Sequence, residues 1–425
     1  MTERKPVRVA HPDLGEATVS ANAVTVVETL RDAGYEAYLV GGCVRDLLLG
    51  GTPKDFDVAT DATPQEVKTV FPRARLIGRR FRIAHVRFRR EFIEVSTFRR
   101  RNEDDDDESD ANHVSADGVL LSDNVYGTLD EDAFRRDFTV NALYYDPVED
   151  AVLDYTTGLD DIETRTLRII GEPRERLRED PVRILRAMRF AAKLGFTLDP
   201  ETRDAIAPMS ELLTAIPPAR LFDEFNKLFM NGHAVAAWSL MWEFGLPEIL
   251  FPLSEDDDRL VRAALQSTDG RVAEDKPVTP GFLLAAMCWP EFERRTALSA
   301  TAKNAADERL KAAHSVIAEQ QLTIAFPRRL SLFIRDVWRL QSTLERRPPR
   351  NLKRTLSHPR FRAAYDFLVL RAETGEADPE LAQWWTDAQE TPAEERGSMT
   401  NALRPGGRRR RRRRGRGRPN PEPAT

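Results

Sequence analysis

The sequence from Leu39 to Thr60 reads LVGGCVRDLLLGGTPKDFDVAT, and it sets the architecture of the first part of the chain. The short apolar run Ala37–Val40 predicts a strand that leads directly into Gly41-Gly42, after which Val44–Leu49 resumes apolar spacing of helical period. Phe56–Thr60 predicts a second strand, continuing from Asp55. This succession of a strand, a glycine turn, a helix and a second strand indicates a mixed α/β unit.

The glycine turn has the character of a phosphate-binding loop. Without a Cβ, Gly41 and Gly42 allow backbone N–H groups to approach a phosphate closely, and the start of the following helix adds partial positive charge. Arg45 supplies a full charge suited to a triphosphate. A Gly-Gly pair alone is more often a simple tight turn, so this interpretation depends on the acidic residues that follow.

Asp55 and Asp57 flank Phe56 on the second predicted strand. Because side chains alternate between the faces of a strand, both carboxylates should project together while Phe56 enters the core. Two close negative charges repel, and a divalent cation relieves the repulsion. Mg²⁺ is a hard ion that binds a few carboxylates, waters and substrate phosphates. An isolated Asp-x-Asp is more often solvated, but its place after the glycine turn favours a metal site.

Residues 39–60 resemble the first signature of the class II nucleotidyltransferases, which comprise the CCA-adding enzymes and the bacterial poly(A) polymerases. The resemblance implies an α+β fold, with a polymerase-beta-like head of mixed sheet and helices followed by an all-α body and a disordered basic tail. It implies that Asp55 and Asp57 hold two Mg²⁺ ions, with Mn²⁺ as an alternative, while Gly42 and Arg45 contact the nucleotide triphosphate. The metals would activate an RNA 3′-hydroxyl and stabilise the leaving pyrophosphate.

Two residues are candidates for a third acidic group. Glu94 lies in FIEVSTFR, on a predicted strand that could pair beside Asp57 and complete the metal cage. Asp137 belongs to RRDFTVNA, which resembles the family's second motif; there Arg136 would face the nucleotide phosphates and Asp137 would support the catalytic site. Glu94 is favoured by geometry and Asp137 by its motif, and both are retained.

A third motif predicts how a base is chosen without a template. Asp180-Pro181 opens a predicted helix, Val182–Leu194, with Asp180 placed as its N-cap. Arg183 and Arg186 follow on one face, and the stretch resembles the family's amino-acid template motif. A carboxylate accepts from the exocyclic amino group of A or C, and an arginine donates to the adjacent ring nitrogen. We therefore expect A and C to be preferred over G and U.

A later stretch, ARLFDEFNK, resembles the family's last helical motif and is expected to brace the template helix. Arg220 and Glu224 in it are four residues apart. A surface ion pair between them is an equally good interpretation.

Three features favour poly(A) synthesis over CCA addition. The run Leu76–His85 (LIGRRFRIAH) resembles a strand signature of the poly(A) polymerases, and its Arg79 and Arg80 are candidates for RNA binding. The C-terminal arginines would neutralise RNA phosphates without reading sequence. None of the six histidines is followed by Asp, so the phosphohydrolase domain of some CCA-adding enzymes is not evident. The arginines of the tail assigned to RNA are Arg408, Arg409, Arg410, Arg411, Arg412, Arg413 and Arg414.

The predicted function is therefore template-independent transfer of AMP from ATP to RNA 3′ ends, a modification that promotes RNA processing and decay. A CCA-adding tRNA nucleotidyltransferase is the first alternative, and a catalytically silent RNA-binding protein is the second. The expected partners are ATP and the RNA 3′ end, with no membrane.

Charge is strongly segregated along the 425 residues. Leu403–Arg418 carries ten arginines and no acids, so the rest of the chain sums to −15 within a net charge of −5. Glu103–Asp110 holds seven acids and predicts a solvated loop. Two cysteines and no apolar leader indicate a reducing cytoplasm. The predicted domains are a lead-in (1–22), a nucleotidyltransferase head (23–170), a helical neck with the base-recognition helix (171–245), a helical body for RNA (246–390) and an Arg-rich tail (391–425).

Overall fold

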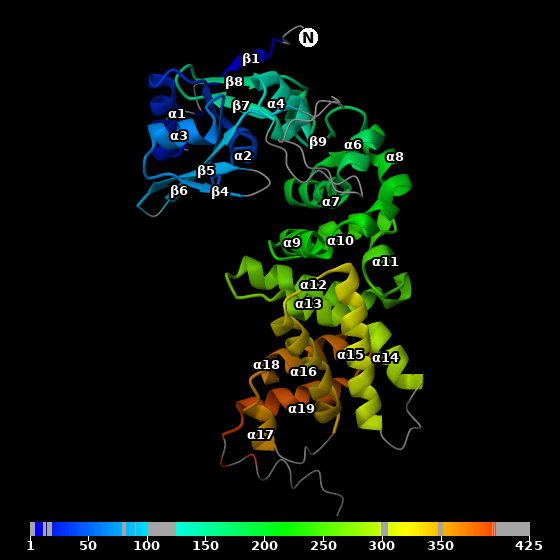
Figure 1. The fold of residues 1–425 in the computed structure, drawn as a ribbon. Helices are drawn as coiled ribbons and strands as arrows, with labels where there is room; N and C mark the ends of the chain where they lie inside the picture. Colours follow the sequence, from blue (N-terminus) through cyan, green and yellow to red (C-terminus); the bar gives the residue numbers. More distant parts are fainter. Residues whose placement is uncertain are drawn as a thin grey trace, which may run out of the picture. The chain divides into compact units, whose positions relative to one another are not determined.

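The computed structural model describes residues 5–11, 14, 19–78, 82–89, 91–100, 125–298, 305–346, 352–392, 394 and 396. The chain divides into two compact units, each with its own packing. Unit 1 takes residues 1–254, 265–278 and 320–325, and unit 2 takes residues 255–264, 279–319 and 326–425. Figure 1 shows the chain from blue to red along its length.

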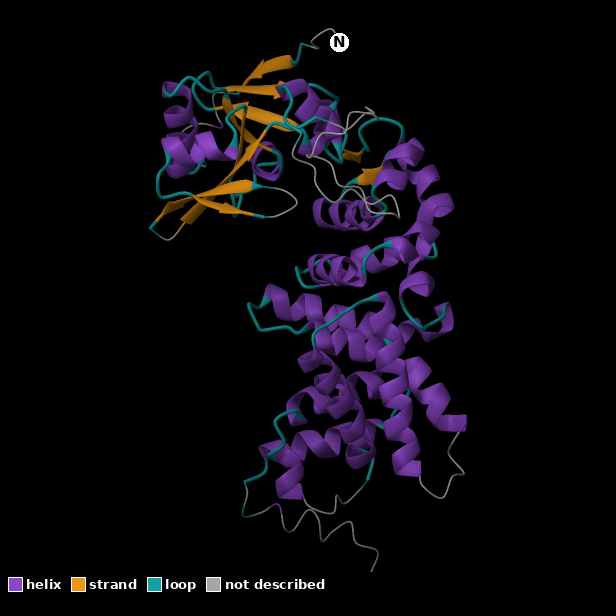
Figure 2. Ribbon diagram, viewed as in Figure 1, coloured by secondary structure: helices purple, strands orange, loops and turns teal. Residues whose placement is uncertain are grey.

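The first part of unit 1 is a mixed sheet with helices, as predicted (Figure 2). Eight strands lie in the order β1-β8-β7-β2-β3-β6-β5-β4, and only the β3–β6 pair of this sheet is parallel. The strands are β1 (Val7–Ala10), β2 (Ala37–Val40), β3 (Asp57–Thr60), β4 (Arg75–Ile77), β5 (Ile83–Phe88), β6 (Glu91–Thr97), β7 (Leu143–Asp146) and β8 (Ala151–Asp154). The helices of this part are α1 (Ala21–Asp32), α2 (Gly42–Leu48), α3 (Pro64–Val70), α4 (Leu129–Arg135), the 3-10 turn η2 (Thr139–Asn141) and α5 (Gly158–Glu163).

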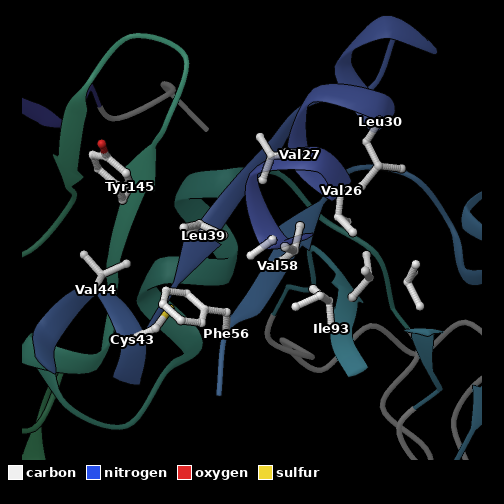
Figure 3. Packing of buried hydrophobic residues seen from close by; sticks show 14 of the residues in the cluster. Val26, Val27, Leu30, Leu39, Cys43, Val44, Phe56, Val58, Ile93 and Tyr145 are labelled. Atoms are coloured by element: carbon white, nitrogen blue, oxygen red, sulfur yellow. The ribbon is translucent and has the colours of Figure 1, made fainter. Parts of the chain in front are cut away.

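The two faces of this sheet bury different side chains. Leu39 and Val58 lie in a core that α1, α2 and α3 contribute to, with Phe56 beside Cys43 (Figure 3). Val40 and Ala59, one residue further along each strand, pack on the opposite face against Ala133 of α4. This alternation follows from the two-residue period of a strand, and it determines which face carries the polar side chains at the strand ends.

Two local differences from the sequence prediction concern this part. Residues 7–10, expected in a loose lead-in, form the edge strand β1 on β8, because Val7 to Ala10 offer a regular ladder to Ala151–Asp154 despite their exposed side chains. The sequence also predicts one helix from Asp132 to Asn141, and this prediction is wrong, since α4 ends at Arg135 and Arg136 is extended (ψ 171°) before η2 begins.

The rest of unit 1 is helical apart from the short parallel pair β9 (Thr166–Leu167) and β10 (Thr197–Leu198). The predicted helix Val182–Leu194 is confirmed as α7, which ends at Gly195 in the left-handed conformation (φ 65°). The other elements are α6 (Pro173–Glu179), α8 (Pro200–Met209), η3 (Ser210–Ala215), α9 (Pro218–Phe229), α10 (Ala234–Glu243) and α11 (Leu246–Leu250).

The described residues beyond Leu250 contain helices and no strands. They are η4 (Glu255–Asp257), α12 (Asp258–Ala273), α13 (Pro280–Met287), α14 (Trp289–Leu298), α15 (Ala305–Thr323), α16 (Arg328–Leu344), α17 (Leu352–Leu356), α18 (Phe361–Glu373) and α19 (Pro379–Glu390). Unit 2 has an aromatic core in which the Phe292 and Trp338 rings stack at 4.5 Å, and Trp338 donates to the Ala285 carbonyl at 3.1 Å. Among the described helices, none has the length and apolar character to cross a membrane.

Candidate active site

Three carboxylates gather at one end of the parallel pair β3–β6. Asp57 is the first residue of β3 and lies opposite Glu94 of β6, while Asp55 precedes the strand. Asp55 therefore lies in the lead to the strand rather than within it as predicted. Phe56 is buried and both aspartates are exposed, so the expected alternation of the three residues holds.

The charges of these carboxylates are poorly compensated. Desolvation, and then the nearby Glu94 and Asp55 charges, raise the pKa of Asp57 to about 6, against the lowering effect of Arg136 and His85. Glu94 is half exposed and its Oε1 lies 3.1 Å from Nε2 of His85. Oxygen donors with excess negative charge fit a hard cation such as Mg²⁺. Across the described residues, however, no group of three or more His, Cys, Asp or Glu side chains forms a ready-made metal cage.

Arg136 is held close to this acidic edge by a buried hydrogen-bond network. Its Nε and Nη2 donate to Oδ2 of Asp132 at 3.1 and 2.9 Å, and the Tyr144 hydroxyl donates to the same oxygen at 2.7 Å. The guanidinium also lies 5.3 Å from the Tyr144 ring centroid. Burial disfavours the charged form, but Tyr144 and Asp132 outweigh that cost and place the pKa of Arg136 above its usual value. The network fixes the direction of a permanent positive charge.

The glycine turn lies against this arginine. Gly41 has φ 79°, and a Cβ placed there would lie 3.4 Å from Nη1 of Arg136. A side chain at Gly41 would therefore strain the backbone and crowd the guanidinium. The helix after the turn, α2, begins at Gly42 rather than near Val44 and has only seven residues, so its terminus contributes little partial charge.

Arg45, which was predicted to contact the triphosphate, already has partners within the protein. It is buried, and its guanidinium donates to the Asn141 side-chain oxygen at 2.5 Å and to Asp46 at 2.6 Å. It also lies 5.2 Å from the Phe190 ring centroid of α7. These contacts engage Arg45 in connecting α2, η2 and α7 rather than leaving its charge free for a triphosphate.

Asp137 is fully engaged within the protein. Its Oδ1 accepts from the Phe138 N–H at 2.8 Å and from the Asn141 amide at 3.1 Å, and its Oδ2 accepts from Nε of Arg186 at 2.8 Å. Burial alone would raise the pKa of Asp137, but Arg186 and these donors hold it below its ordinary value. Asp137 thus ties the loop before η2 to the predicted template helix.

The residues predicted to recognise the base lie at the start of α7. Asp180 precedes the helix: its Oδ1 accepts from the Val182 N–H at 3.3 Å, and its Oδ2 accepts from Arg220 of α9 at 2.7 Å. Arg183 is partly buried and donates to the Arg176 carbonyl at 2.5 Å and to Glu179 at 3.3 Å. Asp180 is not the N-cap predicted for α7, because Pro181 holds that position and Asp180 ends α6. One oxygen of Asp180 accepts from a backbone N–H and the other from a charged partner.

The surface ion pair between Arg220 and Glu224, which was the alternative interpretation of this motif, does not form. Arg220 contacts Asp180 instead, while Glu224 is 5% exposed and pairs with Lys227 at 2.8 Å. Four-residue spacing identifies neighbours on one helix, and here Asp180, which lies between α6 and α7, is the partner of Arg220 instead.

Several residues of this network were not singled out from the sequence: Asp132, Asn141, Tyr144 and Arg176. Arg176 is buried and donates to the carbonyls of Arg135 and Arg136 at 2.7 and 2.8 Å. Asn141 stood inside the quoted RRDFTVNA motif, and Asp132 is four residues before Arg136, so each had a local signal. Arg79, Arg80, the acidic stretch 103–110 and Arg408–Arg414 lie outside the described residues.

Comparison with known proteins places this geometry in a family. The poly(A) polymerase head domain model matches residues 37–168, the probable RNA- and SrmB-binding site of polymerase A matches 195–257, and the polymerase A arginine-rich C-terminus matches 302–418. Poly(A) polymerase I of Haemophilus influenzae is 44% identical over 410 residues, covering 93% of this chain and 90% of that relative. The chain belongs to the bacterial poly(A) polymerase family.

Members of the wider class II family match over less of the chain. The CCA-adding enzyme of Lactobacillus johnsonii is 38% identical over 226 residues, covering 53% of this chain and 54% of that enzyme. The structure of the Bacillus stearothermophilus CCA-adding enzyme in complex with CTP superposes with a TM-score of 0.60 at 27% identity, covering 87% of this chain and 80% of that one. The α+β head and helical body are therefore the fold of this family. The match of the RNA-binding segment to 195–257 lies mostly before the region 246–390 expected to bind RNA.

Proposed function

We propose that this chain is a template-independent polynucleotide adenylyltransferase that transfers AMP from ATP to the 3′ end of RNA. The observation that carries the proposal is 44% identity to poly(A) polymerase I along 93% of the chain. The grouping of Asp57, Glu94 and Arg136 at one strand edge supports it, because binding RNA alone requires no such acidic cluster. The reaction and the two buried free cysteines favour the cytoplasm.

The metal would be held by Asp55, Asp57 and Glu94. Carboxylate oxygens are hard ligands, so the metal that fits this site is Mg²⁺. When bound there, the metal supplies positive charge that activates the attacking 3′-hydroxyl and offsets charge on the leaving pyrophosphate. Desolvation first, and then the Glu94 and Asp55 charges, raise the pKa of Asp57 to about 6, and a cation bound between these carboxylates would offset that repulsion. Asp57 is nonetheless exposed and open to ligands.

Arg136 and the turn at Gly41 and Gly42 would bind the triphosphate. Arg136 is oriented by Asp132 and Tyr144, so little entropy is lost when it meets a phosphate. An arginine so placed can donate to phosphate oxygens in a bidentate manner. We assign Arg45 and Asp137 to positioning: Arg45 holds α2 against η2, and Asp137 holds Arg186.

Asp180 and Arg183 would select the base. The Asp180 carboxylate accepts hydrogen bonds only, which suits the amino group of adenine, and Arg183 donates only, which suits the adjacent ring nitrogen. A guanine or uracil would leave buried groups unpaired, at a cost of about 1–3 kcal/mol each. Arg186 connects this helix to Asp137 and so relates base recognition to the catalytic edge.

An extension assay tests the proposal. Purified protein with Mg²⁺, an RNA primer and ATP alone should give a ladder of lengthening products. A product that stops after one nucleotide, or that needs CTP, would assign CCA addition instead, the activity named for relatives that match 53% and 63% of the chain. No incorporation with any nucleotide, together with retained RNA binding, would leave the catalytically silent RNA-binding protein.

A further inference from the structure

Unit 2 carries two arginines that each face a histidine from another element. Arg335 and Arg339 are one helical turn apart on α16, about 6 Å along its axis. Arg335 Nη1 lies 3.0 Å from Nε2 of His314 on α15, and Arg339 Nη2 lies 3.3 Å from Nε2 of His358, which stands between α17 and α18. The helix α16 packs against α18 in the same unit (Figure 1).

The contact between Arg339 and His358 places two donors face to face. Nδ1 of His358 accepts from the backbone N–H of Arg360 at 3.1 Å. A neutral imidazole has one donor and one acceptor nitrogen, so Nε2 must then carry the proton, and an arginine has no acceptor to offer it. The Nη2 of Arg339 and the Nε2 of His358 therefore both point hydrogens toward the same space. An oxygen that can accept from both would satisfy them together.

The surroundings indicate that this acceptor is an anion. Arg360 lies beside His358 with its guanidinium 5.2 Å from the Phe333 ring centroid, and exposed Lys353 lies on the neighbouring α17. The acid near this pair is Asp336, which contacts Nη2 of Arg339 at 3.3 Å, and Arg339 remains 63% exposed. A single exposed pair of this kind contributes little energy, so Arg339 stays available to a stronger ligand.

We infer that Arg339 and His358 together bind a phosphate of the RNA backbone, with Arg335 one turn away binding the same strand. This inference rests on the proposed function, which requires the chain to hold an RNA primer. A phosphodiester oxygen accepts from both donors at once, and a guanidinium matches phosphate geometry. Contacts of this kind position the strand without reading its sequence, as a polymerase acting on many RNAs requires.

The test measures binding of fluorescently labelled oligoadenylate RNA to the full chain between 50 and 200 mM salt. Arg339→Gln and His358→Ala should each weaken binding at 50 mM salt by about 3- to 10-fold, the net contribution of one hydrogen bond at an exposed site. Arg339→Gln should also lower the slope of log affinity against log salt by about 0.7, the value for one phosphate contact on a single strand. Asp336→Asn should change affinity in the opposite direction, because it removes a competing acid.

Arg362→Gln is the matched control, since Arg362 is an exposed arginine of the same unit that pairs with Asp366 on its own helix. Thermal melting of each variant monitors folding. If Arg339→Gln and Arg362→Gln give the same affinity and salt slope as the wild type, the phosphate site is overturned while AMP incorporation by the wild type still supports the proposed function. If the wild type adds no AMP, the proposed function fails independently of these binding curves.

Discussion

Arg220 of α9 donates to Oδ2 of Asp180 at 2.7 Å, across forty residues of sequence. The other oxygen of Asp180 accepts from the Val182 N–H, so the proposed base-reading carboxylate is held from two sides before any nucleotide enters. An oxygen of a carboxylate has two acceptor sites, so Oδ2 can keep Arg220 and still accept from an amino group. Arg220 thus sets the orientation of Asp180.

We predict that Arg220→Ala impairs selection of ATP. Without its charged partner Asp180 gains rotational freedom, so KM for ATP should rise about 10-fold, the value of roughly 1.4 kcal/mol for a charge-assisted hydrogen bond. Discrimination against GTP and UTP should weaken as well. Steady-state kinetics with each nucleotide measure both effects. Arg203→Ala is the control, because Arg203 forms a comparable exposed pair with Glu243 away from the site; equal kinetics for the two variants would contradict the role of Arg220.

The orientation of Arg136 gives a second prediction. Tyr144→Phe removes the hydroxyl that donates to Asp132 and lies 3.1 Å from Nε of Arg136, so KM for ATP should rise while binding of RNA is unchanged. Stability should fall by about 1–2 kcal/mol, as expected when a buried hydrogen bond is lost. Tyr145→Phe removes a similar hydrogen bond to Asp150, at 2.8 Å, and should leave KM for ATP as it is. If KM for ATP rose equally in both variants, the orientation of Arg136 would not depend on Tyr144.

Asp55→Ala tests the metal assignment. Loss of a carboxylate that holds the metal should remove several kcal/mol of transition-state stabilisation, so AMP incorporation should fall by about 10³-fold. RNA affinity should survive, because the phosphates of the primer bind cationic groups. The matched control is Asp61→Ala, since Asp61 accepts from the Glu36 N–H beyond the far end of β3. Activity retained in Asp55→Ala would show that Asp55 is not a metal ligand.

Local elements were predictable where the sequence carries its own start and stop signals. The helix α7 has the predicted bounds because Asp180-Pro181 begins it and Gly195 ends it. The break after α4 was missed because Arg136 and Asp137 have no helix-breaking character. Asp137 pairs with Arg186 of α7, a tertiary contact that no local pattern specifies, and the backbone leaves the helical path before it.

For the candidate site, the sequence indicated which residues lie near one another on the strands but not which side chains pair across the fold. The alternation of Asp55, Phe56 and Asp57 follows from the two-residue period of a strand. The sequence also indicated that the strand carrying Glu94 could pair beside Asp57. The pair between Arg45 and Asn141 joins positions ninety-six residues apart. No periodicity specifies such a partner, because the packing of α2 against η2 decides it. A charged side chain that the sequence predicts to face a nucleotide can therefore form its hydrogen bonds with other residues of the protein instead.

Acid should selectively remove the contribution of Asp137 to stability. Its folded pKa lies below the ordinary value, so its stabilising effect is fully present above about pH 4 and is lost as pH falls through the folded pKa. The melting temperature of Asp137→Asn should accordingly lie below that of the wild type at pH 6, and the gap should narrow below pH 4. Thermal melts from pH 3 to pH 6.5 measure this gap. A gap of constant size across the range would contradict the ionised state assigned to Asp137.

Deleting residues 403–425 should weaken RNA binding mainly at low salt. The deletion removes ten arginines, and each one that neutralises a phosphate should contribute about 0.7 to the slope of log affinity against log salt. Because such contacts carry no sequence information, the loss should be the same for oligoadenylate and for a mixed-sequence RNA. Binding curves from 50 to 500 mM salt for both RNAs measure the effect. A truncated chain with unchanged affinity at every salt concentration would remove the tail from RNA recognition, and a loss confined to one RNA would show that it reads more than phosphate charge.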